Sequence, residues 1–149
     1  IVNNEPFLIE YNVRMGDPEC QTILPKLKTD FIKLITACVN KNLSSINLEW
    51  YDDKSLCIVL CSKGYPEIYK NNIEIKNLKD IKLNQNEFIF HAGTKKEKNK
   101  ILSNGGRVLN FVIRSDSFKN NREKATDLIN KIDWENGFFR KDIGHKVID

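Results

Sequence analysis

The stretch Leu56-Cys57-Ile58-Val59-Leu60-Cys61 decides the fold class of this chain. It is a continuous apolar run that ends before Gly64 and Pro66, a pattern typical of a strand buried on both faces. Residues 87–91 and 107–113 are predicted to be further strands. The central and later parts of the chain therefore predict a small, mostly antiparallel sheet.

Two segments outside these strands have the apolar spacing of an amphipathic helix. In the first, Phe31, Leu34, Ile35 and Cys38 follow the i, i+3, i+4, i+7 rule. Thr29 or Asp30 is placed to cap this helix, which should end near residues 40–42. The second helix begins at Ser117, and its apolar stripe consists of Phe118, Ala125, Leu128, Ile129 and Ile132.

Turn residues divide the rest of the chain. Pro25 separates a short first turn from the first helix, because proline is poorly tolerated in a helix interior. Asn104-Gly105-Gly106 can adopt positive backbone angles, so residues 101–102 are predicted as the first arm of a hairpin whose second arm is residues 107–113. Residues 46–50 and 73–75 have the alternation or position of further short strands.

The length and hydrophobic content bound the size of the fold. The chain has 149 residues, of which 40% are hydrophobic, enough for one core, although it could also be the end of one domain joined to a second. It opens at Ile1 and its one methionine is Met15, so we expect the C-terminal piece of a longer protein. No apolar run reaches the roughly 18 residues of a membrane span, and no membrane partner is expected.

The charge distribution argues against nucleic acid as a partner. Twenty-four basic and twenty acidic residues give a net charge of +4, and the excess is spread along the chain. A nucleic-acid-binding protein more often has a concentrated basic stripe with interleaved aromatic residues. One short cluster, Lys95, Lys96, Lys98 and Lys100, is predicted to lie in a solvated loop.

The cysteines do not indicate a disulfide framework or a zinc site. They are Cys20, Cys38, Cys57 and Cys61. Cys57 and Cys61 share one face of the predicted strand but lie too far along it to pair. The two histidines, His91 and His145, are far apart and unsuited to complete a zinc site. Buried free thiols in a reducing cytoplasm are therefore expected.

Residues 7–14 alternate between apolar and polar side chains. In a strand, Phe7, Ile9, Tyr11 and Val13 would point one way, and the polar residues at positions 10, 12 and 14 the other. Those three polar residues are Glu10, Asn12 and Arg14. A carboxylate beside an amide oxygen suits Mg²⁺, and an Arg can grip a phosphate or a carboxylate. The alternatives are an ordinary exposed strand face and, for Arg14, a surface salt bridge.

A turn follows this predicted strand directly. Gly16 permits close approach to a ligand, and Pro18 fixes the backbone. Asp17 could orient the amine of a substrate or hydrogen-bond its own turn. Glu19 comes next, with a less certain role.

Residues 10–19 resemble the last core strand and the following loop of the phosphoribosylamine–glycine ligase family, ATP-grasp enzymes of purine biosynthesis. The resemblance continues in the family's order through the four strings Lys63-Gly64-Tyr65-Pro66, Phe90-His91-Ala92-Gly93-Thr94, Asn104-Gly105-Gly106-Arg107-Val108-Leu109 and Arg140-Lys141-Asp142-Ile143-Gly144. It covers nearly all of the chain. Two positions depart from the family pattern, because members often have a small residue at Lys63 and Phe at Met15.

The resemblance implies an α+β fold in two parts. Residues 1–43 would be the C-terminal end of the ATP-grasp catalytic domain, a strand plus a helix. Residues 44–149 would form a small, mostly antiparallel β domain with one packed helix. The nucleotide-binding parts of the family would lie in the missing N-terminal part of the same polypeptide, so the segment alone should be inactive.

The resemblance also implies an activity. ATP would phosphorylate glycine to glycyl phosphate, and 5-phosphoribosylamine would displace phosphate to give glycinamide ribonucleotide. Glu10 and Asn12 match the ligands of magnesium or manganese in the family, and Arg14 would be the catalytic cation. The implied substrate-binding residues are Arg14, Gly16, Asp17, Pro18 and Glu19.

Two other interpretations stay open. The chain could be a non-catalytic sheet domain that docks a partner subunit, or part of a sister ATP-grasp ligase with another carboxylate substrate, such as a carboxylase or a formate-using transformylase. His91 is expected to be a strand-end histidine with a satisfied side chain, because the implied mechanism needs no strong base. Arg107 and Arg140 could bind an anion or tie the C-terminal part to the core.

Overall fold

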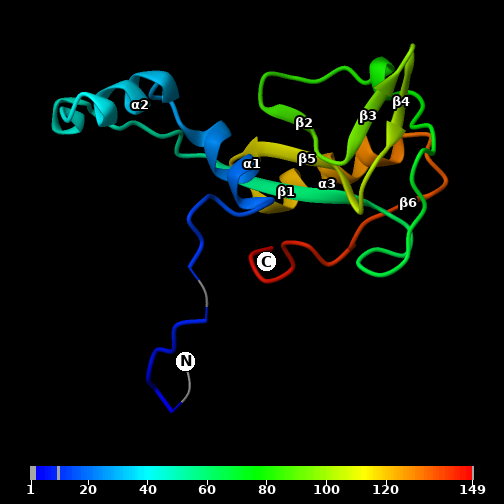
Figure 1. Ribbon diagram of the computed structural model, residues 1–149, viewed down its shortest axis with the longest axis horizontal. Coiled ribbons are helices and arrows are strands. Elements are labelled where there is room, and N and C mark those ends of the chain that lie inside the picture. The colour runs from blue at the N-terminus through cyan, green and yellow to red at the C-terminus, as the bar shows by residue number, and fades with distance from the viewer. Residues whose placement is uncertain (1–2, 10, 149) are drawn as a thin grey trace.

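A computed structural model describes residues 3–9 and 11–148. Its centre is a four-stranded antiparallel sheet with the strand order β2-β5-β1-β6. The strands are β1 (Lys54–Ser62), β2 (Glu87–His91), β5 (Arg107–Ser115) and β6 (Gly137–Phe138). The long pair β1 and β5 forms the middle of the sheet (Figure 1), as the apolar runs predict.

The β1–β5 ladder carries most of the core. Ile58 pairs with Phe111 and Leu60 with Leu109, and all four side chains are buried. β5 is buried along nearly its whole length. β1, for which burial on both faces is predicted, instead alternates between buried and half-buried side chains as far as Leu60. The register shifts by one residue between Leu60 and Cys61, where a bulge or irregularity interrupts the ladder.

One helix covers a face of this sheet. Helix α3 (Phe118–Asn130) begins after Ser117, whose hydroxyl accepts a hydrogen bond from the backbone N–H of Asn120 at 3.4 Å. Its buried apolar residues join the core cluster of β1 and β5; they are Ala125, Leu128 and Ile129. The predicted start is confirmed, and so is the stripe as far as Ile129. Ile132 lies beyond the end of the helix, where it packs partly buried against the same core.

A second, two-stranded sheet corrects two predictions. Strands β3 (Thr94–Glu97) and β4 (Lys100–Ser103) pair with each other, so residues 101–102 do not form a hairpin with β5. The lysine cluster lies on this hairpin rather than in a loop. The turn falls at Lys98, which itself takes a positive φ of 52°. Asn104-Gly105-Gly106 instead links β4 to β5, and among described glycines only Gly64 and Gly144 have positive φ.

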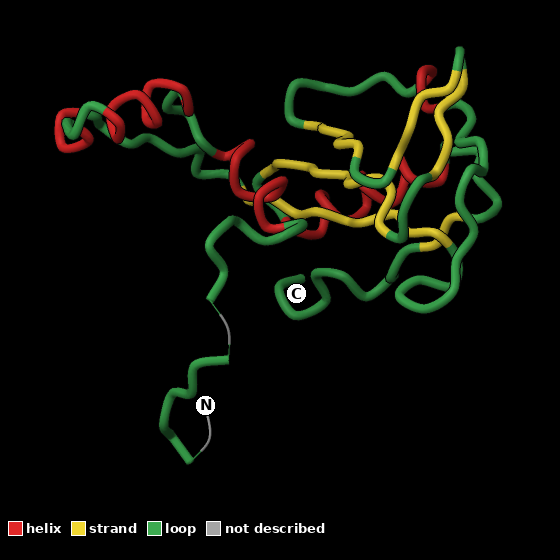
Figure 2. The backbone as a smooth tube through the Cα atoms, in the orientation of Figure 1, coloured by secondary structure: helices red, strands yellow, loops and turns green. Residues whose placement is uncertain are grey.

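Between residue 19 and β1 the chain is mostly helical, with α1 beside β1 and α2 extending away from the sheet (Figures 1 and 2). It contains α1 (Glu19–Ile23), the 3-10 turn η1 (Leu24–Lys26), α2 (Phe31–Val39) and η2 (Leu43–Ser45). Asp30 caps α2 by accepting from the backbone N–H of Lys33 at 3.0 Å. Pro25 lies in η1, between the two helices. These features confirm the predicted helix and its boundary.

The predicted strand over residues 7–13 is wrong for the residues described. Neither residues 7–9 nor residues 11–13 belong to a strand, and Ile9 and Val13 are 93% and 96% exposed. A strand needs a neighbour for its backbone hydrogen bonds, and no described strand pairs with this segment. The alternation therefore does not produce an apolar face and a polar face here.

Two other short strands are also absent from the described residues. Residues 46–50 contribute only an isolated bridge from Trp50 to Leu27, and residues 73–75 only one from Glu74 to Leu102. Between β1 and β2 the chain forms one further 3-10 turn, η3 (Leu78–Asp80). Residues 46–50 and 73–75 each hydrogen-bond to a neighbouring segment, but one bridge pair each is too little for a ladder.

The chain is a small mixed α/β fold with antiparallel sheets and few helices. This confirms a mostly antiparallel sheet with one packed helix, whereas the ATP-grasp context and the boundary between residues 43 and 44 stay predictions. All four cysteines are free thiols as predicted, but only Cys61 is buried: Cys20 and Cys57 are half-buried, and Cys38 is exposed because it lies on the projecting helix α2. None of the helices in the described part of the chain has the length and apolar character needed to cross a membrane.

Candidate functional site

A groove lies beside the Gly16-Asp17-Pro18 turn, and we call it the Arg107 groove. Its volume is about 440 Å³. β1 supplies its floor, and the segments after β1 and β6 supply its walls. The residues that line it include Pro18, Cys57, Cys61, Tyr65, Arg107 and Arg140. The groove therefore joins the predicted substrate turn to residues far away in the sequence.

Arg107 connects this groove to the turn. Its Nε lies 3.2 Å from Asp17 Oδ2, and its Nη1 donates to the backbone carbonyl of Asp17 at 3.1 Å. One guanidinium thus holds both the side chain and the backbone of the same residue. Arg107 ties the turn to the sheet, the second of the two roles considered for it.

The turn is also bonded within itself. The backbone N–H of Gly16 donates to Glu19 Oε2 at 2.6 Å, and Gln21 Nε2 donates to Asp17 Oδ1 at 2.8 Å. The carbonyl of Pro18 accepts from the hydroxyl of Thr22 at 2.8 Å. Asp17 and Glu19 therefore have clear local structural roles at the start of α1. Their predicted roles in substrate binding are a separate matter, and they stay predictions.

The residues predicted to hold metal and phosphate lie farther along the exposed segment. Glu10 lies outside the described residues, and Asn12 is exposed. Arg14 is exposed as well, and its Nη1 donates to the adjacent carbonyl of Met15 at 3.0 Å. The structure thus brings Pro18 to the groove and Asp17 to Arg107, but it does not gather Asn12 and Arg14 on a common strand face.

The described residues fit a divalent cation only in part. Asn12 offers one amide oxygen of the kind Mg²⁺ accepts, while the carboxylate partner predicted for it is Glu10. In residues 3–9 and 11–148, no group of three or more His, Cys, Asp or Glu side chains could hold a metal. Mg²⁺ needs few protein oxygens when a nucleotide supplies others, so a metal at this segment would depend on groups outside the described residues.

The floor of the groove is chemically inert. Burial raises the pKa of the Cys57 thiol to about 12, with smaller effects from Thr22, which lowers it, and Asp17, which raises it. Burial also raises the pKa of Cys61, against the lowering influence of Arg107. A thiolate is the nucleophilic form of cysteine, so these two side chains provide apolar surface rather than reactive groups.

Arg140 lies at the opposite wall of the groove. Its guanidinium makes two hydrogen bonds to Asp142, Nε to Oδ1 at 3.0 Å and Nη2 to Oδ2 at 2.7 Å. This pairing holds the pKa of the Asp142 carboxyl down at about 2. Both groups are solvent-exposed, so Arg140 presents a cation at the rim without desolvation of its charge.

Three of the four downstream strings that carried the family resemblance meet at this groove. They supply Tyr65 and Pro66, Arg107, and Arg140 and Ile143. Sequence reasoning did not predict this meeting, because the strings are separated by tens of residues and are joined only by strand pairing. The available signal in the sequence was Gly105-Gly106, directly before Arg107, because glycines permit close packing.

Gly93 and Gly106 let the backbone pack closely against its neighbours, and neither has an unusual backbone angle. A Cβ on Gly106 would lie 2.1 Å from the ring of Tyr65, and one on Gly93 would lie 2.7 Å from the carbonyl oxygen of Arg107. The string containing His91 thus packs, through Gly93, against the backbone of Arg107, which lines the groove. His91 itself shares a hydrogen bond of 2.8 Å with Thr94 through Nδ1, which confirms it as a satisfied strand-end histidine.

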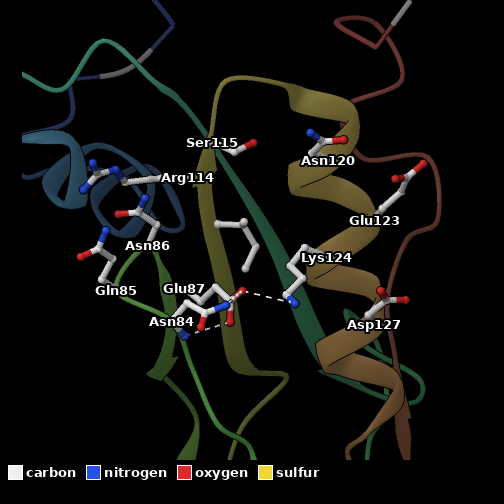
Figure 3. Close-up of a pocket in the computed structure, with 11 residues that line it drawn as sticks. Asn84, Gln85, Asn86, Glu87, Arg114, Ser115, Asn120, Glu123, Lys124 and Asp127 are labelled. Carbon is white, nitrogen blue, oxygen red and sulfur yellow. Dashed lines mark hydrogen bonds and ion pairs between the residues drawn. The ribbon is translucent and has the colours of Figure 1, made fainter.

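A second hollow of about 470 Å³ lies between β2 and α3 (Figure 3). At its base the buried Glu87 accepts from the backbone N–H and the side-chain amide of Asn84, at 3.1 and 2.9 Å, and Lys124 Nζ lies 3.5 Å away. Burial alone would raise the pKa of Glu87, but these contacts outweigh it and the pKa is lowered. The central charge of this hollow is already compensated, which favours a structural role.

A buried cation fixes the other end of β5. Arg114, with its side chain 5% exposed, makes a bidentate contact with Asp53, at 3.2 and 3.1 Å from Nε and 2.8 Å from Nη2. It also donates to the carbonyl of Pro25 and lies over the ring of Tyr51. Sequence reasoning missed this residue, because nothing in the sequence around it marks a buried arginine. Arg114 attaches the projecting N-terminal part to the sheet.

Comparisons with known proteins identify a family and relatives of this chain. The sequence matches the family described as "Phosphoribosylglycinamide synthetase, C domain" over residues 55–146. The chain is 46% identical to the phosphoribosylamine–glycine ligase of Caldanaerobacter subterraneus subsp. tengcongensis, covering 93% of this chain and 32% of the relative. It is 41% identical to the ligase of the same name from Fusobacterium nucleatum, covering 97% and 34%. The chain thus spans about a third of the length of these relatives.

A solved structure agrees with the sequence relatives. The phosphoribosylamine–glycine ligase of Thermotoga maritima matches this fold with a TM-score of 0.67 and 29% identity, over 95% of this chain and 34% of that one. The family match covers β1 to the C-terminal tail, the part that builds the sheet and most of the groove. The chain therefore belongs to the phosphoribosylglycinamide synthetase C-domain family.

Proposed function

We propose that this chain is the C-terminal part of an ATP-dependent ligase that joins glycine to 5-phosphoribosylamine in purine biosynthesis. The observation that carries the proposal is 46% identity to a phosphoribosylamine–glycine ligase over 93% of this chain. The meeting of the Gly16-Asp17-Pro18 turn with the Arg107 groove supports it, because ligand-binding residues concentrate in loops held on a rigid scaffold.

The reaction we propose proceeds through glycyl phosphate. The glycine carboxylate is ionised at neutral pH and attacks the terminal phosphate of ATP, and the amine of phosphoribosylamine then displaces inorganic phosphate. Negative charge gathers at the transferred group, so the protein acts mainly through positioning and cationic stabilisation. No residue of this chain is needed as a strong base.

Glu10 and Asn12 would hold Mg²⁺ or Mn²⁺, which would neutralise charge on the nucleotide phosphates. Arg14 would supply a second cation, since its guanidinium is exposed and bonded only to the adjacent carbonyl among the contacts described. Gly16, Asp17, Pro18 and Glu19 would shape the substrate turn. The nucleotide-binding residues would come from the remainder of the polypeptide.

The exposed apolar surface of the N-terminal part supports contact with that remainder. Helix α2 exposes Phe31, Ile32, Ile35 and Val39. Unpartnered apolar surface of this kind marks an interaction site. The relatives are about three times as long as this chain, so the remaining polypeptide is the partner we propose for it. A separate docking subunit is the alternative, and it would leave catalysis independent of Glu10.

The test uses the complete ligase polypeptide and follows phosphate release from ATP with and without glycine and phosphoribosylamine. The wild type should release phosphate only with glycine, and not when bicarbonate or formate replaces it. Glu10→Ala and Asn12→Ala should each lower kcat/KM by at least about tenfold, because each removes an oxygen ligand. Lys76→Gln, which removes a cation from the exposed pair with Asp133, is the matched control.

Two results would contradict the proposal. Glycine-independent phosphate release by the wild type would remove the assigned reaction and favour a sister ligase. Full glycine ligation by Glu10→Ala would remove the assigned metal ligand and favour the docking alternative.

A further inference from the structure

We propose that Arg107 is a positioning residue that fixes the Gly16-Asp17-Pro18 turn on the sheet and thereby sets the affinity of the ligase for phosphoribosylamine. This inference rests on the proposed function. Its basis is the double contact of one guanidinium with Asp17, at 3.2 Å to the carboxylate and 3.1 Å to the backbone carbonyl. Two directed contacts from a planar group fix orientation as well as distance.

Arg107 is itself firmly held. It is the first residue of β5 and pairs with Cys61 of β1 just beyond the irregularity in the ladder. Its carbonyl accepts from the backbone N–H of Gly93 at 2.9 Å, and the close packing at Gly93 leaves no room for a side chain there. The anchor of the contact is therefore part of the rigid sheet.

Arg107 gives the turn a direct connection to β5. Asp17 Oδ1 is occupied by Gln21, and the N–H of Gly16 is occupied by Glu19, so these bonds hold the turn to α1 only. Residues 11–15, just before the turn, are exposed. The contacts of Arg107 join the turn directly to β5, 90 positions away in the sequence.

The contact also lies at the groove. Pro18 and Arg107 both line it, and the charges of Asp17 and Arg107 both act on the thiol of Cys61 at its floor. A shift of the turn would therefore change the shape of the groove at Pro18, next to Asp17, which is one of the residues predicted to bind substrate. The nucleotide contacts assigned to the remaining polypeptide should be unaffected.

A purely structural ion pair is the competing explanation. The side chains of Arg107 and Asp17 are 41% and 37% exposed, and pairs with such exposure contribute little to stability. A structural role thus predicts small effects on stability, on kcat and on the KM of every substrate. A positioning role predicts a selective rise in KM for one substrate, because loss of uniform binding raises KM and leaves kcat unchanged.

The experiment measures steady-state kinetics of the complete ligase with Arg107→Gln, Arg107→Lys and Lys76→Gln. Arg107→Gln should raise the KM for phosphoribosylamine about tenfold, the usual order for losing charge-assisted hydrogen bonds. Its kcat and its KM for ATP should stay within about threefold of the wild type. Arg107→Lys should recover part of the affinity, because an ammonium can keep one of the two contacts. Lys76→Gln should behave as the wild type.

The variant Asp17→Asn tests the contact from its other side, and combined with Arg107→Gln it should add little to the single effects. An unchanged KM for phosphoribosylamine in Arg107→Gln would overturn the inference. A lowered melting temperature with an unchanged KM, or an equal rise in the KM for ATP, would overturn it as well. Failure of the wild type to ligate glycine would instead remove the proposed function, so the two failures are distinguishable.

Discussion

The sheet unit, residues 54–138, and the N-terminal arm, residues 3–48, differ in how they use apolar side chains. In the sheet unit Val108, Leu109, Phe111 and Val112 are fully buried. In the arm Ile9, Val13 and Val39 are mostly exposed, and Ala37 is its one fully buried hydrophobic residue among those described. The comparison teaches that the sheet unit holds its own core, whereas the arm carries apolar surface suited to another part of the protein.

The largest effect should come from the core of the sheet unit. Phe111→Ala removes a fully buried ring and should lower the free energy of unfolding by about 3–5 kcal/mol. The matched change Phe7→Ala removes an exposed ring of the arm and should cost less than about 0.5 kcal/mol. Denaturant unfolding followed by circular dichroism measures both. Equal losses in the free energy of unfolding would contradict the distinction between a buried core in the sheet unit and exposed apolar side chains in the arm.

The junction between the regions should give the next largest effect. Asp53→Ala leaves the buried Arg114 guanidinium without its carboxylate and should cost about 2–3 kcal/mol. The control Asp133→Ala breaks an exposed pair of 3.8 Å with Lys76 and should cost at most about 0.5 kcal/mol. Denaturation midpoints compare the two variants. A small cost for Asp53→Ala would show that Arg114 does not attach the arm.

The two helix caps offer a matched pair of smaller effects. Ser117→Ala removes the cap of α3, which packs on the core, and should lower the free energy of unfolding by about 1 kcal/mol. Asp30→Ala removes the cap of α2, which projects from the sheet, and should leave the main unfolding transition unchanged. Fluorescence of the buried Trp134 would follow that transition. A shift with Asp30→Ala would mean that α2 unfolds together with the sheet.

The smallest effect concerns acid stability of the sheet unit. The lowered pKa of Glu87 means that its contribution to stability is present above the ordinary glutamate pKa of about 4.3 and is lost as pH falls through the lower folded value. Glu87→Gln should therefore flatten the decline of stability below about pH 4.3. Thermal melting between neutral and acid pH measures this. An unchanged slope would show that the carboxylate contributes nothing.

The sheet and the capped helices could be predicted because their signals are local. The apolar run 56–61, the Asp30 cap and the stripe of α3 each fix one element within a few residues. The segment 7–13 has the same kind of pattern yet forms no strand in the described residues. No strand of residues 3–9 and 11–148 pairs with it, and periodicity alone does not show whether an alternating segment has a neighbouring strand.

The site was predictable only at the level of its turn. Gly16, Asp17 and Pro18 could be singled out because glycine and proline mark a loop after an alternating segment. The contact of Arg107 with Asp17 and the buried Arg114 could not, because each joins residues distant in sequence through the packing of the sheet. Arg107 and Arg140 were equal candidates in the sequence, and only the structure separates a turn-holding arginine from an exposed rim cation.

The most direct test is amide hydrogen exchange of α2 and β5, measured for this chain alone and for the complete ligase. In the chain alone, β5 should exchange slowly and α2 fast, because Ala37 is the one buried residue of α2 whereas β5 is buried along nearly its whole length. In the complete ligase, α2 should become protected as its apolar face is covered. Protection of α2 already in the chain alone, or fast exchange of α2 in both, would contradict the division into a self-supporting sheet unit and a dependent arm.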